Sequence, residues 1–168
     1  LRERHIEWIG RCRHAHCTAR TAALYWVGMS HKLPVIKVVG VSAGGKSTLV
    51  RLLRERGYDA RAVSQEHSEV PTLWKQFEPP RVLVYLDTTL EAQQQRRPDG
   101  QWDAATLDEE RRRLRNAYAE ADLRVNNAEF TPDQLLALVL AYLRAKRIRH
   151  ANAPLPEAPI TGAPMRKR

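Results

Sequence analysis

Eight consecutive residues, Gly40 to Ser47, read Gly-Val-Ser-Ala-Gly-Gly-Lys-Ser and could bind the phosphate groups of a nucleotide. They complete the pattern G-x-x-x-x-G-K-[ST], in which the backbone amides of a glycine-rich loop surround phosphate oxygens. In that arrangement Lys46 reaches the β- and γ-phosphates, and the Ser47 hydroxyl binds Mg²⁺. An ordinary glycine-rich turn would account for the glycines but not for the Lys-Ser pair. We therefore predict that the phosphates of a nucleotide and Mg²⁺ bind here, through Gly40, Ser42, Ala43, Gly44, Gly45, Lys46, Ser47 and Thr48.

The candidates for catalysis are Lys46, Glu66, Asp87 and Arg97. A carboxylate beside an acceptor hydroxyl can take its proton during phosphoryl transfer, which is the role predicted for Glu66 if it does not lie in a solvated loop. Asp87 ends an apolar run and could hold Mg²⁺ together with Ser47, or could cap the following helix. Arg97 follows Arg96 and could neutralise charge on the triphosphate, or could lie in solvent at a helix end.

Several neighbouring residues have two readings that the sequence leaves open. His67 follows Glu66 and could belong to the site or to a solvated loop. An aromatic ring could stack on a nucleotide base, although aromatic residues at such spacings more often pack in a core. The aromatic candidates are Trp74, Tyr85, Trp102 and Tyr118.

The pattern of apolar residues predicts the elements that must position these side chains. A β-branched run, Val35–Val39, precedes the loop as a strand. An amphipathic helix over Ser47–Arg56 follows the loop and ends at Gly57. Beyond it we expect strands over Ala60–Ser64, Arg81–Asp87 and Leu123–Asn126, and a short helix around Val70–Phe77.

Three capping-box patterns mark the starts of later helices: Thr88-x-x-Glu91, Thr106-x-x-Glu109 and Thr131-x-x-Gln134, the last with Pro132 at its first helical position. The alternation of strands and helices predicts an α/β fold with a mostly parallel sheet and helices on both faces. In such sheets ligands bind at the carboxyl ends of the strands. That rule selects Gly40–Ser47, Gln65–Ser68 and Asp87–Thr89 as the site.

Charge and composition limit the classes of function. The 168 residues carry a formal net charge of +9, and more than half of this excess lies outside the predicted core. A phosphate-binding site accounts for the rest, so we do not expect binding to a polynucleotide. No apolar run approaches the roughly 18 residues of a membrane span. Cys12, His14, His16 and Cys17 are more closely spaced than the ligands of structural zinc sites, and two reduced thiols fit a cytoplasmic location.

We predict three segments along the chain. Residues 1–28 form an N-terminal extension that is poorly structured or additional to the domain, and residues 29–149 form the nucleotide-binding domain. Residues 150–168 are rich in proline and end in Arg166-Lys167-Arg168, which predicts a disordered basic tail. The oligomeric state is left open.

The chain resembles the P-loop containing nucleoside triphosphate hydrolase superfamily, in its small-molecule and nucleotide kinase-like branch. The resemblance covers about residues 34–145. It rests on the loop, on Pro80–Asp87 with Thr88–Glu91 and Arg96-Arg97 after it, and on Ala121–Asn126 followed by Thr131–Leu136. It implies a three-layer P-loop NTPase fold, an ATP and Mg²⁺ site on Gly40, Gly45, Lys46 and Ser47, and a lid arginine at Arg96 or Arg97.

The activity that this resemblance implies is transfer of the ATP γ-phosphate to a small metabolite or nucleotide. A nucleotide-dependent sensor or switch, and a simple NTPase, are the alternatives. Nucleoside and thymidylate kinases carry an Asp-Arg pair on an additional strand, and this sequence has no such pair between Gly57 and Pro80. The small-molecule acceptor is therefore not named by the resemblance.

Overall fold

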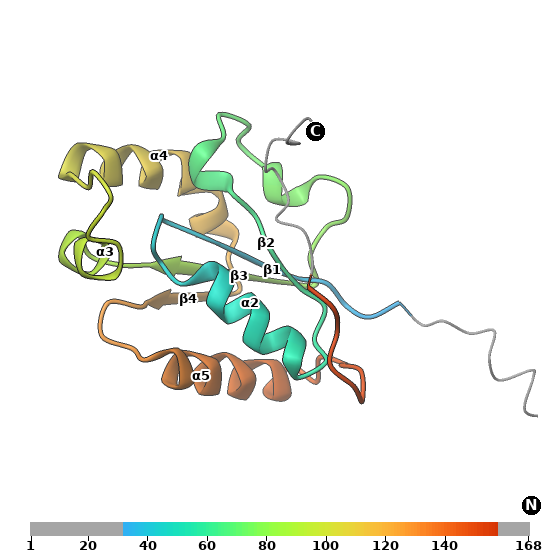
Figure 1. The fold of residues 1–168 in the computed structure, drawn as a ribbon. Coiled ribbons are helices and arrows are strands. Elements are labelled where there is room, and N and C mark those ends of the chain that lie inside the picture. The colour runs from blue at the N-terminus through green and yellow to red at the C-terminus, as the bar shows by residue number, and fades with distance from the viewer. Residues whose placement is uncertain (1–31, 158–168) are drawn as a thin grey trace, which may run out of the picture. The chain divides into compact units, whose positions relative to one another are not determined.

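A computed structural model describes residues 32–157. The chain divides between Lys32 and Leu33 into two units, and the description that follows concerns the second. Its centre is a four-stranded, entirely parallel sheet in the order β2-β1-β3-β4 (Figure 1). The strands are β1 (Ile36–Gly40), β2 (Ala60–Ala62), β3 (Val82–Asp87) and β4 (Leu123–Asn126). Because all four run in the same direction, their carboxyl ends meet at one edge of the sheet.

Helices cover both faces of the sheet. In Figure 1, α2 (Lys46–Glu55) and α5 (Pro132–Ala145) lie on one face, and α4 (Ala104–Glu120) lies on the other. The short helix α3 (Leu90–Arg96) follows β3, and two 3-10 turns, η1 (Gln65–His67) and η2 (Leu73–Lys75), connect β2 to β3. The predicted α/β class, parallel sheet and two-sided helix cover are confirmed.

The two faces of β1 and β3 belong to separate apolar clusters. Val38 and Val84 pack with the buried residues of α2 and α5, while Val39 and Tyr85 pack with those of α4. Strands covered on both faces need apolar side chains at every position rather than at alternate ones. This explains the continuous apolar run of β3 before Asp87, whereas β1 also contains the buried Lys37, whose ammonium donates to two backbone carbonyls.

Most predicted elements are present, with small shifts at their ends. The capping box of α5 is confirmed, with Thr131 as cap, Gln134 as its partner and a proline in the first turn. The other two helices begin differently: α3 is capped by Thr89 rather than Thr88, and α4 by Asp103 rather than Thr106. In each case a second residue able to cap lies within three positions, and tertiary packing selects between them. The predicted helix at 70–77 is only the 3-10 turn η2.

The residues after α5 correct the predicted domain end and disordered tail. The amide of Ala151 donates to the Gly57 carbonyl at 2.9 Å, and the amide of Leu155 donates to the Arg54 carbonyl at 2.9 Å. The approach at Gly57 is so close that a Cβ there would lie 2.2 Å from the Ala151 oxygen, and Gly57 has a φ of +82°. Residues 150–157 are thus part of the folded domain, which the proline-rich composition did not indicate. The predicted boundary at 28/29 and the rest of the tail lie outside the described residues.

A chain that ends at His150 is therefore expected to be less stable than one that ends at Glu157. The shorter chain loses the Ala151 and Leu155 amide bonds and the bond that the Arg54 guanidinium donates to the Pro156 carbonyl. Three such bonds contribute about 3 kcal/mol to the free energy of unfolding. Urea unfolding of the two chains, with identical N-termini, measures the difference. Equal unfolding midpoints would show that this segment contributes nothing to stability.

The same region predicts a dependence of stability on pH. Burial raises the pKa of Asp59, but hydrogen bonds from Arg61 and Arg54 outweigh it and hold that pKa below its ordinary value. A lowered pKa means that the carboxylate stabilises the fold above about pH 4 and loses this effect as the pH falls through the folded-state pKa. Asp59→Asn should thus be less stable than the wild type at pH 7, with the gap narrowing in acid.

Urea unfolding at pH 7 and at pH 3 tests this expectation. Asp99→Asn serves as the control, because Asp99 is exposed in the turn after α3. A gap between Asp59→Asn and wild type that stays constant with pH would contradict the role given to the two arginines.

No helix within residues 32–157 combines the length and the apolar character that crossing a membrane requires.

Candidate phosphate-binding site

A pocket of about 600 Å³ lies at the carboxyl edge of the sheet, where the loop Val41–Gly45 joins β1 to α2. Nine predicted site residues line it: Ser42, Ala43, Gly44, Gly45, Lys46, Ser47, Thr48, Glu66 and Arg97. The predicted residues Gly40 and Asp87 do not line the pocket. The structure thus brings the loop together with the end of β2 and the end of α3, as the strand-end rule predicts for the first two segments.

Gly40 lies at the junction of β1 and the loop, where the backbone passes very close to β3. Its φ is +152°, and a Cβ at this position would lie 2.0 Å from the Leu86 carbonyl oxygen. Only glycine allows β1 to turn into the loop so close to β3. The role of Gly40 is therefore this close approach of two backbones.

The start of α2 differs from that of the other described α-helices. The side chains of Thr89, Asp103 and Thr131 cap α3, α4 and α5, whereas the cap of α2 is Gly45, which has no side chain to accept a hydrogen bond. The amides of Lys46 and Ser47 donate no hydrogen bond within residues 32–157. Such amides, at the positive end of the helix dipole, bind anions.

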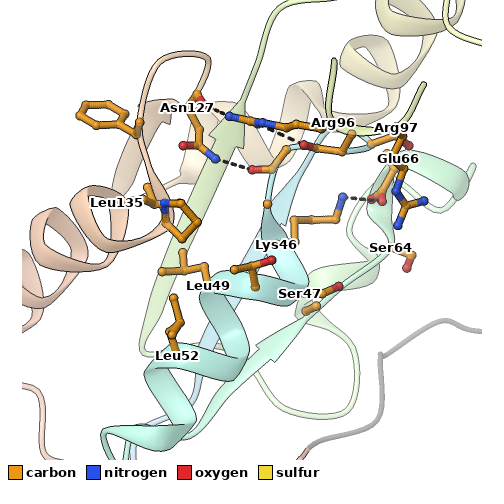
Figure 2. Close-up of a pocket in the computed structure, with 18 of the residues that line it drawn as sticks. Lys46, Ser47, Leu49, Leu52, Ser64, Glu66, Arg96, Arg97, Asn127 and Leu135 are labelled. Carbon is orange, nitrogen blue, oxygen red and sulfur yellow. Dashed lines mark hydrogen bonds and ion pairs between the residues drawn. The ribbon is translucent and has the colours of Figure 1, made fainter. Parts of the chain in front are cut away.

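Lys46 and Glu66 meet in the pocket, as Figure 2 shows. The Lys46 ammonium lies 2.6 Å from Glu66 Oε1 and donates to the carbonyls of Gly40 and Val41, each at 2.9 Å. Both side chains are largely buried, at 11% and 4% exposed. The second carboxylate oxygen, Glu66 Oε2, is buried without a hydrogen-bond partner in the described residues. This buried, unpaired oxygen leaves the polar contacts of the site incomplete.

The end of β2 places Glu66 and its neighbours beside the loop. η1 begins at Gln65, three residues after β2 ends at Ala62, and the Arg113 guanidinium of α4 donates to the Glu66 carbonyl at 3.3 Å. His67 Nε2 lies 3.7 Å from Glu66 Oε1, but its side chain is 64% exposed. Ser64, Glu66 and His67 all line the pocket.

The two adjacent arginines have different surroundings. Arg96 donates to the Ala43 carbonyl at 3.1 Å, to Thr88 Oγ1 at 3.4 Å and to the carbonyls of Asn127 and Ala128. Arg97 lines the pocket, and its guanidinium makes no hydrogen bond or ion pair with residues 32–157. Its side chain is thus available to a ligand, while Arg96 joins the loop to the segment after β4.

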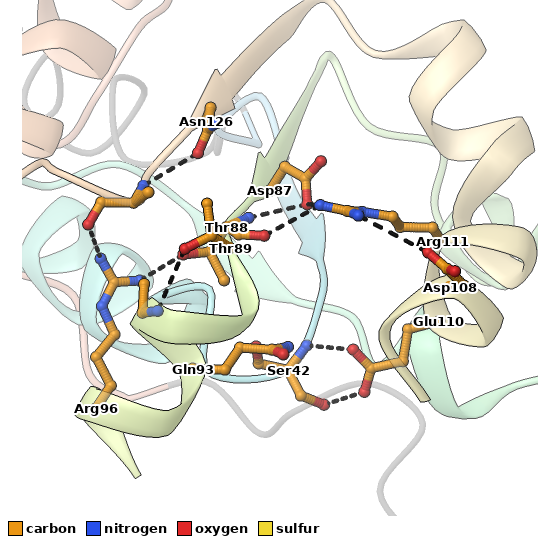
Figure 3. A network of polar contacts seen from close by, with 12 residues as sticks. Ser42, Asp87, Thr88, Thr89, Gln93, Arg96, Asp108, Glu110, Arg111 and Asn126 are labelled. Carbon is orange, nitrogen blue, oxygen red and sulfur yellow. Dashed lines mark hydrogen bonds and ion pairs between the residues drawn. The ribbon is translucent and has the colours of Figure 1, made fainter. Parts of the chain in front are cut away.

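Asp87 does not occupy the predicted position in the pocket. Its Oδ1 accepts from the Arg111 guanidinium at 3.1 Å and from the Thr88 amide at 2.9 Å (Figure 3). The sequence did not indicate this contact, because Arg111 lies within a run of arginines on a helix that begins after the next turn. The predicted roles of Asp87 in catalysis and Mg²⁺ binding therefore receive no support from its position.

Sequence reasoning missed four residues around the loop. Asn127 and Phe130 lie between β4 and α5 and line the pocket, while Gln93 and Glu110 contact Ser42 from α3 and α4. None belongs to a short motif with the loop. The strand-end rule applied to β4 was the one signal that could have found Asn127. The four aromatic residues considered for base contact do not line the pocket, and Phe130 does.

The pocket has two chemically distinct sides, which Figure 2 shows on either side of the α2 N-terminus. On one side lie Ser47, Ser64, Glu66 and Arg97, and on the other lie Leu49, Leu52 and Leu135. The lining also includes His67, Phe130 and Pro132. A ligand that fits both sides has a charged part and an apolar or aromatic part.

The oxygen atoms of the pocket residues also determine which metal ion could bind there. No group of three or more His, Cys, Asp and Glu side chains that could hold a metal exists among residues 32–157. The exposed Ser47 hydroxyl and the Glu66 carboxylate offer the oxygen ligands that Mg²⁺ prefers, and phosphate oxygens commonly supply others. The residues fit Mg²⁺ that arrives with a phosphate ligand. The Cys12–Cys17 cluster lies outside the described residues.

Comparison with known proteins adds no relative: no protein-family model matches the sequence, and no curated protein matches it either.

Proposed function

We propose that this protein binds a nucleoside triphosphate, ATP, with Mg²⁺ and belongs to the P-loop kinase-like proteins that its loop resembles. One observation supports this most: the uncapped start of α2, with Lys46 beside it, opens into the pocket that also holds Glu66. Free helix amides and an ammonium bind phosphate, and the Lys46 and Ser47 amides make no hydrogen bond within residues 32–157.

The charges of the described pocket lining are consistent with such a ligand. Lys46, Arg96 and Arg97 are cations there, and Glu66 is the one carboxylate. The polar side suits the phosphates, and the apolar side suits the base. Lys46 and Arg97 would hold the phosphates, and Ser47 would hold Mg²⁺, whose charge offsets that of the phosphate oxygens.

The proposed reaction is transfer of the terminal phosphoryl group to a hydroxyl of a small metabolite or nucleotide. The bound triphosphate supplies the phosphoryl group. Glu66 accepts the hydroxyl proton as the acceptor oxygen bonds to phosphorus and the bond to the leaving diphosphate breaks. Lys46 and Arg97 stabilise the charge that develops on the transferred group and the leaving oxygen. Glu66 must first exchange its contact with Lys46 for the acceptor.

A nucleotide-dependent sensor or simple NTPase is the second candidate. It is favoured by the direct pairing of β2 with β1, which leaves no strand between them to carry acceptor-binding residues. In that case Glu66 orients water or responds to the phosphates.

Measurement of ADP release by purified protein with Mg-ATP distinguishes these functions. The panel of added acceptors contains nucleosides, nucleotides and small hydroxy compounds, each with a matched analogue that lacks the hydroxyl. Release stimulated by one acceptor, but not by its analogue, supports the transferase. Acceptor-independent release supports an NTPase, and tight binding without release supports a sensor. A protein that neither binds nor consumes Mg-ATP contradicts the whole proposal.

A further inference from the structure

The backbone of the loop is held from outside by side chains of distant segments. Three successive carbonyls are bonded: Gln93 donates to Ser42 O at 2.9 Å, Arg96 to Ala43 O at 3.1 Å and Asn127 to Gly44 O at 2.8 Å. In a trans peptide bond, the carbonyl of one residue and the amide N–H of the next residue point in opposite directions. Fixing these carbonyls therefore fixes where the next amides point.

Glu110 completes this arrangement on the side of α4. Its carboxylate accepts from the Ser42 amide at 2.9 Å and from the Ser42 hydroxyl, as Figure 3 shows. Gln93 bonds the remaining polar atom of Ser42, its carbonyl oxygen. All the polar atoms of one loop residue are thus bonded by buried side chains from two different helices.

The buried carboxylate of Glu110 lowers the stability of the fold unless its contacts compensate for the loss of water. It is 4% exposed, and no ion pair with a described residue balances its charge. A buried carboxylate without a cation destabilises a fold relative to an apolar residue of similar size. Its negative charge beneath an anion site also opposes phosphate binding. The hydrogen bonds of Glu110 are made to Ser42, so its structural role is to hold this loop residue in place.

We propose that Glu110 and Gln93 are positioning residues that keep the loop in its phosphate-binding conformation. This inference rests on the function proposed above. Neither residue lines the pocket, so both act through Ser42 rather than on the ligand. If the loop samples other conformations when these contacts are lost, the apparent affinity falls in proportion to the competent fraction.

Two substitutions test the proposal, Glu110→Ala and Gln93→Met, the second of which keeps length but removes the donor. Each substitution leaves a buried backbone amide or carbonyl unpaired in the binding conformation, which lowers the fraction of molecules that adopt it. Each should therefore weaken binding of Mg-ATP and of inorganic tripolyphosphate about tenfold. Glu110→Gln keeps an acceptor for the Ser42 amide and should restore binding to within about threefold of wild type. Glu120→Ala, at the far end of α4 with an exposed carboxylate, is the control.

Three readouts separate positioning from a general loss of stability: calorimetric affinity, the melting temperature, and hydrogen exchange of the Ser42 amide. Positioning predicts faster exchange at Ser42 and weaker binding at temperatures where the variant is fully folded. Wild-type affinity in folded Glu110→Ala and Gln93→Met, whatever their melting temperatures, overturns the inference. If Glu110→Ala does not fold, Gln93→Met carries the same test by itself, with wild-type affinity again overturning the inference. Absence of binding by the wild type instead overturns the proposed function on which the inference depends.

Discussion

Lys46→Ala is expected to abolish measurable binding of Mg-ATP. The ammonium lies at the uncapped start of α2 and donates to the carbonyls of Gly40 and Val41. Lys46 is the one cationic residue of the loop motif Gly40–Ser47. Removing it takes away the charge that pairs with the phosphates, and a charge-assisted contact of this kind contributes about 1.5–3 kcal/mol or more in a partly buried site. Calorimetry with Mg-ATP measures the loss directly.

The substitution has a second effect that must be separated from the first. Without Lys46, the carboxylate of Glu66 is buried and unpaired, which destabilises a fold by about 3–5 kcal/mol. The double variant Lys46→Ala/Glu66→Gln removes both charges and should fold while still failing to bind. Lys146→Ala, in the exposed turn after α5, is the matched control and should bind normally. Undiminished affinity in the folded double variant would remove the main support for the proposed function.

Glu66→Gln is expected to lower turnover by about a hundredfold or more while affinity for Mg-ATP stays close to that of wild type. A general base contributes on the order of 10²–10⁴ to the rate, and an amide cannot accept the proton. Binding should not weaken, because the substitution removes a negative charge 2.6 Å from the Lys46 ammonium. Steady-state kinetics with the acceptor, together with calorimetry, separate the two quantities.

Glu69→Gln provides the control for this experiment. Glu69 lies in the same connection between β2 and β3, but its carboxylate is 67% exposed and contacts Arg112 and Arg113 rather than the pocket. It should leave turnover within about twofold, as expected for a surface pair. A parallel loss of affinity and rate in Glu66→Gln would show that Glu66 holds the triphosphate or its cation, not the acceptor.

The parts of the site that could be predicted are those determined by residues that are adjacent in the sequence. The loop, the apolar strand before it and the amphipathic helix after it are adjacent in sequence, and each restricts the next. The strand-end rule then placed Glu66 correctly beside Lys46, although η1 itself was not expected. Continuous apolar character identified β3, and a largely apolar, β-branched run identified β1, because both strands are covered on two faces.

The parts that could not be predicted depend on contacts between distant residues. Asp87 follows an apolar strand whether it faces a ligand or Arg111, and only the packing of α4 decides. Glu110 and Ser42 are 68 positions apart, and no spacing rule connects them. The cap of α4 was misplaced for a related reason, since Asp103 and Thr106 are both suitable caps and only one begins the helix.

The run Arg111–Arg113 shows how composition can mislead. Its charge is typical of a solvated helix surface or a polyanion-binding face. In the structure, Arg111 contacts Asp87 at the end of β3, and Arg113 contacts the Glu66 carbonyl beyond β2. With Glu110 bonded to the loop after β1, neighbouring positions of α4 reach the ends of three strands. Arg111 and Arg113 therefore hold strand ends from the surface of α4, at 41% and 27% exposed, which is a role that a charge count does not indicate.

The support of the loop from later segments has a consequence for the protein as it emerges from the ribosome. The loop is synthesised early, but Asn127, which bonds Gly44, follows it by 83 positions. At a translation rate of about 5–20 residues per second, roughly 4–17 s separate the two, apart from passage through the exit tunnel. During that time the motif exists as a sequence without the side chains that hold its carbonyls. A nascent chain would therefore acquire the phosphate affinity that we propose only late, after β4 has joined the sheet.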